Sequence, residues 1–212
     1  GALPRFGPIR SPVKSSTSCM LSEQHRPTRV RLNIIHVTDP TVLQRIYQFR
    51  VQVWLTVPGV QPDTFPDGTW QDAHDAHARH WAIFDENNIV GAARLCIHQD
   101  LRDIPDTHLF RDIDVSFPLP IASINRVVVH PRMRGRGLAR QLDQARLEQA
   151  ARLGCRSVVG CWTQVSGEPR WRALERQGFR PVNGGILLPD IPFGLSIPLA
   201  LWSFGPLARV LV

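Results

Sequence analysis

The glycine- and arginine-rich segment from His130 to Ala139 constrains this chain more than any other part of it. The segment follows the β-branched run Val127–Val129 and opens a stretch with helical spacing that runs to Gly154. Glycines let a backbone approach a ligand closely, and the free N–H groups at a helix start attract an anion. Four arginines add positive charge here: Arg132, Arg134, Arg136 and Arg140. We therefore expect a strand, then a turn that holds a phosphate group, then a helix.

The spacing Arg-x-x-Gly-x-Gly at residues 132–137 resembles the acyl-CoA signature of the GNAT superfamily of N-acyltransferases. A strand at 157–162 and a helix ending in Gly178-Phe179 resemble later elements of that family. The resemblance spans about residues 30–185 and implies an α/β (α+β) fold, with a mixed, mostly antiparallel sheet flanked by helices on both faces. It also implies that the turn and the strand before it bind acyl-CoA, through Val127, Val128, Val129, Arg132, Met133, Arg134, Gly135, Arg136, Gly137, Leu138 and Ala139.

Local patterns predict the order of the elements and one domain at 29–212. We expect strands at 29–37, 80–84, 89–97, 121–129 and 157–162, and helices at 40–55, 138–153, near Leu109 and at 170–177. Residues 1–28 are rich in Pro, Ser and Arg and are expected to form a flexible arm; Met20 is a candidate start, which leaves open whether residues 1–19 are native. The apolar stretch 186–212 is broken by prolines and Asp190, so terminal strands are expected rather than a transmembrane helix. An apolar wall for a long acyl chain, or an edge that touches a membrane, is the alternative.

Charge and cysteine usage indicate the kind of partner and compartment. The formal net charge is +7, which suits an anionic partner such as CoA, an acidic carrier protein, nucleic acid or a membrane surface. The four cysteines show no paired spacing, and residues 1–30 lack the apolar core of a secretion signal, which favours the cytoplasm. The run from Asp72 to His80 is dense in metal-ligand residue types, but no partner motif recurs downstream, so no metal is expected.

A second resemblance, over residues 50–126, is to the acyl-homoserine-lactone synthases. Matching positions are Arg50 and Trp54, the acids Asp72 and Asp75, the strand 91–95 with Arg94, and Ser123-Ile124-Asn125-Arg126. The last motif has Glu in that family, where this chain has Ser123. The resemblance implies that Trp54, Asp72, Arg94 and Arg126 bind the substrate, and it adds an acyl carrier protein as an alternative acyl donor.

Attack of an amine on a thioester needs a proton acceptor and donors that stabilise the oxyanion. The tyrosine and asparagine that the GNAT resemblance would supply are replaced by Leu174 and Pro169. The remaining candidates are Asp72, His74, Asp75, His77, His130 and Glu168; of these, Asp75 or His74 is the predicted base, with Ser123 as a further catalytic candidate.

The sequence therefore predicts an acyl-CoA-dependent N-acyltransferase that acts on a primary amine of a small molecule, amino acid or peptide. A homodimer is the assembly that we consider for this chain. The alternatives are a synthase that uses acyl carrier protein, and a non-catalytic nucleic-acid-binding protein with the same fold; nucleic acid is the less favoured partner.

Overall fold

The computed structural model describes residues 32–105, 107, 117–163, 167–188 and 197–204. The chain groups into two compact units, and the described residues all belong to the second, Arg31–Val212. The predicted arm at 1–28, the predicted helix near Leu109 and parts of the apolar stretch after residue 188 lie outside the described residues.

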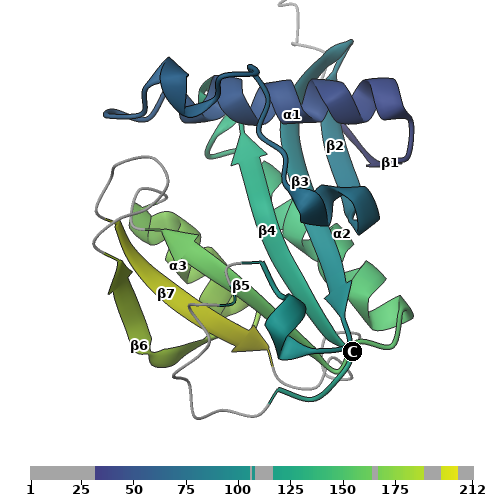
Figure 1. Cartoon of the computed structure of the whole chain (residues 1–212), viewed down its shortest axis with the longest axis vertical. Coiled ribbons are helices and arrows are strands. Elements are labelled where there is room, and N and C mark those ends of the chain that lie inside the picture. Colours follow the sequence, from purple (N-terminus) through teal and green to yellow (C-terminus); the bar gives the residue numbers. More distant parts are fainter. Residues whose placement is uncertain (1–31, 106, 108–116, 164–166, 189–196, 205–212) are drawn as a thin grey trace, which may run out of the picture. The chain divides into compact units, whose positions relative to one another are not determined.

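A seven-stranded sheet organises this unit in the order β1-β2-β3-β4-β5-β7-β6 (Figure 1). Every neighbouring pair is antiparallel except β4 and β5, which are parallel. This confirms the predicted mixed, mostly antiparallel sheet. The strands are β1 Asn33–Val37, β2 Arg79–Asp85, β3 Asn88–His98, β4 Ile121–Val129, β5 Ser157–Thr163, β6 Arg180–Leu188 and β7 Ile197–Phe204.

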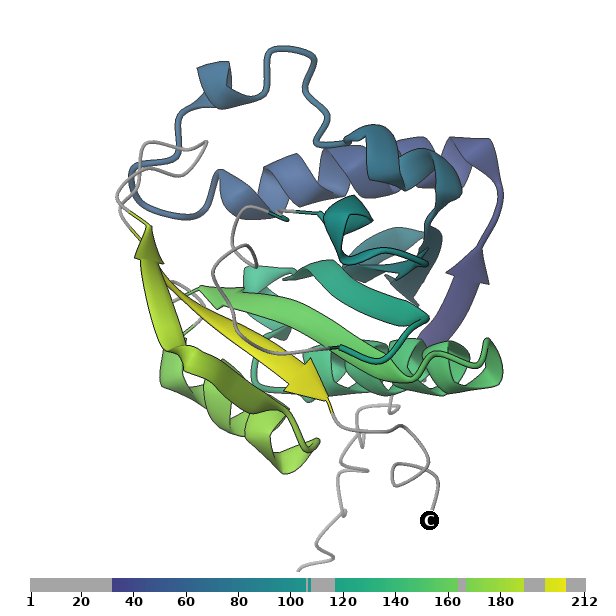
Figure 2. The ribbon, with the colours of Figure 1, turned by 60° about the horizontal axis from the view of Figure 1, so that its bottom comes forward.

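Helices cover both faces of the sheet, as predicted: α1 lies on one face, and α2 and α3 lie on the other (Figure 2). The helix α1 begins where the sequence indicates, because the Asp39 side chain accepts hydrogen bonds from the backbone of Thr41 and Val42. The helices are α1 Pro40–Trp54, α2 Leu138–Arg152 and α3 Gly167–Arg176, with short 3-10 turns at η1 Pro62–Thr64, η2 Ala73–His77, η3 Leu101–Asp103 and η5 Pro131–Met133.

Two apolar layers hold β3 and β4 between the helices. On one face, Leu138 and Leu142 of α2 are buried against strand residues that include Leu95 and Ile124. On the other face, Phe49 of α1 packs with apolar residues of β2, β3 and β4. Since burying one large apolar side chain contributes about 1.5–3 kcal/mol, the central strands are fixed from both sides.

The ends of the predicted elements differ from the structure in small ways. The first strand begins at Asn33, and α3 begins at Gly167, three residues before the predicted start. The apolar stretch contributes the end of β6 and all of β7, and β7 is inserted between β5 and β6. Within the described ranges, no helix has both the length and the hydrophobicity needed to cross a membrane.

Candidate active site

The parallel strands β4 and β5 form a fork. They pair only from Ile121 to Ile124 on β4 and from Ser157 to Gly160 on β5, and then diverge toward their C-terminal ends (Figure 1). Gly160 allows close approach at the base, because a Cβ atom there would lie 3.0 Å from the Ile124 carbonyl oxygen. Beyond this point, β4 presents to the fork a backbone edge that is unpaired within the described strands. N–H and C=O groups on such an edge can bind an extended ligand.

A bulge in β4 lies beside the opening of the fork. The ladder joins Arg94 to Asn125 and Ala92 to Val128, so two β4 residues face one β3 residue. Arg126 in the bulge has a φ of 53°, in the left-handed region that non-glycine residues rarely adopt. Arg146 of α2, fully buried, donates to the carbonyl oxygens of Arg94 at 3.0 Å and Asn125 at 3.1 Å. The bulge is therefore held in place by α2, from the face of the sheet that α2 covers.

The turn after β4 has the geometry of an anion site. Gly135 and Gly137 have φ values of 76° and 79°, and a Cβ on either would meet nothing within 4 Å. Gly137 precedes α2 without a side-chain cap, and the first turn of α2 contains no acidic residue. The first-turn N–H groups have no acceptor inside the helix, and without a cap or a nearby carboxylate they favour an anion. The arginines of this segment lie exposed around it: Arg132, Arg134, Arg136 and Arg140.

The predicted acyl-CoA residues lie together along the fork edge and this turn. Val128, Met133 and Leu138 have buried side chains, and Val127 and Val129 pack against the core on the α2 side. Contact with a ligand would therefore come from their backbone. Gly135, Arg136 and Gly137 are exposed, and Ala139 is partly exposed. Their binding of acyl-CoA remains a prediction.

On the α1 side of the bulge, five residues form an ion-pair network that we call the arginine–aspartate cluster: Arg50, Asp72, Asp75, Arg94 and Arg126. The Asp75 carboxylate lies 3.0 Å from both the Arg50 and Arg94 guanidinium groups. The Asp72 carboxylate accepts from Arg94 at 2.6 Å and from Arg126 at 2.7 Å. The cluster therefore joins α1, η2, β3 and β4, and it includes three of the four predicted substrate-binding residues.

Burial and pairing shift the ionisation of the cluster. Burial opposes ionisation of Asp72, but hydrogen bonds from Arg94 and Arg126 outweigh it and hold the Asp72 pKa below its usual range. Burial lowers the pKa of Arg50 to about 10, against the opposing effect of Asp75. Burial and the nearby Arg50 charge lower the pKa of His80 to about 4. At neutral pH, His80 is therefore uncharged, whereas Asp72 and Arg50 are ionised.

Asp75, a predicted base, has little contact with solvent. Its residue is 5% exposed. One oxygen accepts from Arg50, and the other accepts from the Asp72 backbone N–H at 2.8 Å in a capping box at the start of η2. Both carboxylate oxygens are occupied by donors of the protein, as expected for a residue that fixes η2 and two arginines.

The other two catalytic candidates lie along a different polar path. The Ser123 hydroxyl is 2.8 Å from Nε2 of His98, and the Asn125 side-chain amide donates to the same hydroxyl at 3.3 Å. The His74 ring stands edge-on to His98, with 6.3 Å between centroids. Burial, with a further effect from His74, lowers the His98 pKa to about 4, so His98 is neutral at pH 7.

Sequence reasoning did not identify His98 and Arg146 as functional candidates. His98 follows Arg94 at an interval of four on β3, so the two residues share one face of that strand. Arg146 follows Leu142 at the interval that places it on the apolar stripe of α2, where a charge requires a partner. The sequence therefore contains a signal for each residue: the spacing of His98 from Arg94, and the charge of Arg146 on an apolar helix face.

Trp54, the fourth predicted substrate-binding residue, packs in an aromatic group. Its ring stands edge-on to Trp70, with 5.2 Å between centroids, and Trp70 also contacts Phe65. Trp70 also contacts the cluster, because the Arg126 guanidinium lies 4.0 Å from the centre of its ring, and Tyr47 lies 5.1 Å from the Arg50 guanidinium in the same way. A cation over an indole face is a favourable contact.

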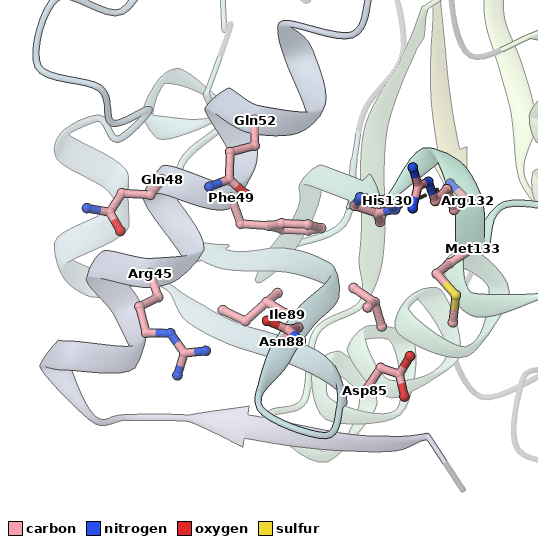
Figure 3. A pocket seen from close by; sticks show the side chains of 11 residues that line it. Arg45, Gln48, Phe49, Gln52, Asp85, Asn88, Ile89, His130, Arg132 and Met133 are labelled. Atoms are coloured by element: carbon pink, nitrogen blue, oxygen red, sulfur yellow. Dashed lines mark hydrogen bonds between the residues drawn. The ribbon is translucent and has the colours of Figure 1, made fainter. Parts of the chain in front are cut away.

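A pocket of about 520 Å³ lies between α1, the β2–β3 hairpin and the segment after β4. Figure 3 shows the Phe49 ring extending from α1 toward His130, with Arg132 and Met133 beside it. Arg45 lines the pocket and donates to the Asn87 carbonyl oxygen. The pocket adjoins the start of the glycine turn and offers both charged and apolar walls.

The histidine- and aspartate-rich run at 72–80 does not converge on one point. Asp75 and His80 belong to the buried network around Arg50, and His74 faces His98. Among the residues that the structure describes, no group of three or more His, Cys, Asp or Glu side chains is arranged to hold a metal ion.

Comparison with known proteins identifies a family. The family model described as "Acetyltransferase (GNAT) family" matches residues 43–179, which include the cluster, the fork and the glycine turn. Comparison with curated protein sequences gives no match.

Solved structures share the fold at low sequence identity. The chain is similar to Arabidopsis thaliana NAA60 in complex with acetyl-CoA, with 16% identity, a TM-score of 0.57 and coverage of 82% of this chain and 98% of that one. It is similar to the AHL synthase LasI, with 15% identity, a TM-score of 0.59 and coverage of 81% and 90%. It is also similar to yncA of Salmonella typhimurium with acetyl-CoA, with 18% identity, a TM-score of 0.55 and coverage of 82% of this chain and 93% of that one. Because the family model matches more than half of the chain, the protein belongs to the GNAT acetyltransferase family.

Proposed function

We propose that this protein transfers an acyl group from acyl-CoA directly to a primary amine of a small molecule, amino acid or peptide. The observation that carries the proposal is the open β4–β5 fork, which leads to the uncapped start of α2 at Gly137. GNAT family membership supports acyl-CoA-dependent N-acyl transfer in general. The choice of a primary amine as the acceptor is part of the proposal, and the proposal leaves the length of the acyl chain open.

The residues divide into a binding turn and a reacting strand. The first-turn N–H groups of α2 and the surrounding arginines would hold the CoA diphosphate. The open edge of β4 at Val127–Val129 would bind the pantetheine arm and donate to the carbonyl oxygen as it gains charge. The amine nitrogen bonds to the thioester carbon, the C–S bond breaks, and the thiolate takes a proton from solvent.

The proton of the attacking amine needs an acceptor on the α1 side of β4. We assign it to His74, which is partly exposed and stands edge-on to the buried His98. Because the pKa of His98 is lowered to about 4, His98 is a weak base at neutral pH and is assigned a supporting role beside Ser123. Asp75 is assigned a positioning role, because both of its oxygens accept from protein donors. This chain needs no covalent intermediate, since the fork would bring donor and amine together.

Two measurements test the proposal. Thermal unfolding is followed with CoA, acetyl-CoA and longer acyl-CoA thioesters, and thiol release is then assayed with a panel of primary amines. We expect CoA thioesters to raise the unfolding midpoint and at least one amine to accelerate thiol release. Tight, salt-sensitive binding of duplex DNA without any stabilisation by CoA would overturn the proposal in favour of a binding protein.

A second candidate is a synthase that receives its acyl group from acyl carrier protein. The assembled arginine–aspartate cluster favours it, because those positions carry the resemblance to acyl-homoserine-lactone synthases. Turnover with acylated carrier protein should then fall steeply with salt. Equal or faster turnover with free acyl-CoA rejects this candidate.

The proposal places the enzyme in the cytoplasm. Cys96 and Cys155 are buried free thiols, which suits a reducing compartment. A homodimer remains a prediction, which light scattering of the purified protein would test.

A further inference from the structure

The arginine–aspartate cluster carries more positive than negative charge. Three guanidinium groups, of Arg50, Arg94 and Arg126, face the two carboxylates of Asp72 and Asp75. The nearby His80 is neutral at pH 7 and adds no charge. Buried charges are expected to be paired, so the cluster has room for one more negative charge.

Donors in the cluster also lack acceptors. Within the described part of the chain, Nε of Arg50, Nη2 of Arg94 and Nε of Arg126 are buried without a hydrogen-bond partner. A buried N–H without an acceptor costs free energy, and more so on a charged group. Two of these three donors belong to arginines that already bind Asp72, so unused donors accompany the charge surplus at the Asp72 side of the cluster.

The accessible edge of the cluster lies beside the fork. The side chains of Arg50 and Arg94 are fully buried, whereas those of Arg126 and Asp72 are 21% and 27% exposed. Arg126 is the bulge residue of β4, in the part of the strand that does not pair with β5. Its guanidinium lies over the Trp70 ring, which holds the exposed end in place.

We propose that the cluster binds the carboxylate of the acceptor through Arg126, so the acceptor is a small amine that also carries a carboxylate, such as an α-amino acid. This inference rests on the proposed acyl transfer at the fork. A monoanion matches the single surplus charge. A carboxylate also matches the planar guanidinium, which can donate to both of its oxygens. Asp72 and Asp75 then keep the arginines in place rather than contact the amine.

A binding experiment tests the cluster without turnover. Benzoate and benzamide have nearly the same shape and differ in charge. At matched ionic strength, benzoate is expected to raise the thermal unfolding midpoint of the protein in a saturable way, and benzamide is not. Arg126→Gln should abolish the benzoate response, and Arg126→Lys should retain a weaker one. The control Arg102→Gln should leave it unchanged, because Arg102 is exposed and pairs only with Asp100 within the described structure.

Turnover then tests the substrate class. For any amino acid accepted by the enzyme, kcat/KM should exceed that of its carboxamide at least tenfold. In Arg126→Gln this ratio should fall to about one, mainly through KM, while the KM for acyl-CoA stays unchanged. Equal responses to benzoate and benzamide, or a full benzoate response in Arg126→Gln, would overturn the inference. Benzoate binding without stabilisation by any CoA thioester would instead overturn the proposed acyl transfer and leave the carboxylate site standing.

Discussion

Replacing Asp75 with asparagine separates a structural role of this residue from a role as general base. The substitution keeps the shape of the side chain and removes its charge. In the structure, the carboxylate lies 3.0 Å from both Arg50 and Arg94, whose side chains have no exposed surface. Removing one partner of a buried ion pair costs about 3–5 kcal/mol, because the remaining charge stays buried without compensation.

That cost is a large part of the total stability of a domain, which is about 5–15 kcal/mol. We expect Asp75→Asn to lower the free energy of unfolding by about 3 kcal/mol or more. For a chain of this size, each kcal/mol corresponds to roughly 2–4 °C in unfolding midpoint. Urea unfolding followed by tryptophan fluorescence and by circular dichroism measures the loss.

The matched control is Asp100→Asn. Asp100 pairs with the exposed Arg102 at the surface, so its unfolding midpoint should match that of the unchanged protein. If Asp75→Asn is as stable as the unchanged protein but loses acyl transfer, the assignment of Asp75 as a positioning residue is refuted and its role as base is restored.

Three further changes test the turn, the fork and the buried histidine. Gly135→Glu should abolish stabilisation by CoA without unfolding the chain, because it places a negative charge at the anion site; Gly154→Glu, at a glycine with a similar φ and equally open space at the far end of α2, should retain CoA stabilisation. Gly160→Ala should destabilise the protein by about 1–3 kcal/mol, because the new Cβ would lie 3.0 Å from a backbone oxygen of β4; an unchanged urea midpoint would contradict the close contact. Because the His98 pKa is lowered to about 4, the unfolded chain binds its proton first as pH falls from about 6.5, so stability should decline toward pH 4. His98→Gln should remove up to about 1.4 kcal/mol per pH unit of that decline, and an unaltered pH dependence of unfolding would count against the neutral histidine.

Features with local causes could be predicted from the sequence. The start of α1 follows from Asp39-Pro40, and the glycine turn follows from the spacing of Gly135 and Gly137 after a β-branched run. The strand β4 has the predicted ends. In each case, the residues that decide the structure lie within a few positions of one another.

Features that depend on distant partners could not be predicted in the same way. Nothing near Asp75 in the sequence shows that Arg50 and Arg94 occupy both sides of its carboxylate. The left-handed conformation of Arg126 results from a mismatch in register between two strands, supported by a helix residue twenty positions later. Pairing of Ser123 with His98 likewise requires the β3–β4 register. The residue types of the candidate site are therefore visible in the sequence, whereas the contacts between them are not.

The insertion of β7 between β5 and β6 makes one side of the β4–β5 fork depend on a distant stretch of chain. The strand β5 meets β4 at four residue pairs but meets β7 at six, including the diverging part from Cys161 to Thr163. The direction in which β5 diverges from β4 is therefore determined more by its pairing with β7 than by its pairing with β4. Substitutions in β7 are therefore expected to change the width of the β4–β5 fork without touching the residues of β4. If acyl-CoA binds at the fork as proposed, such substitutions should alter which acyl chain lengths the enzyme accepts.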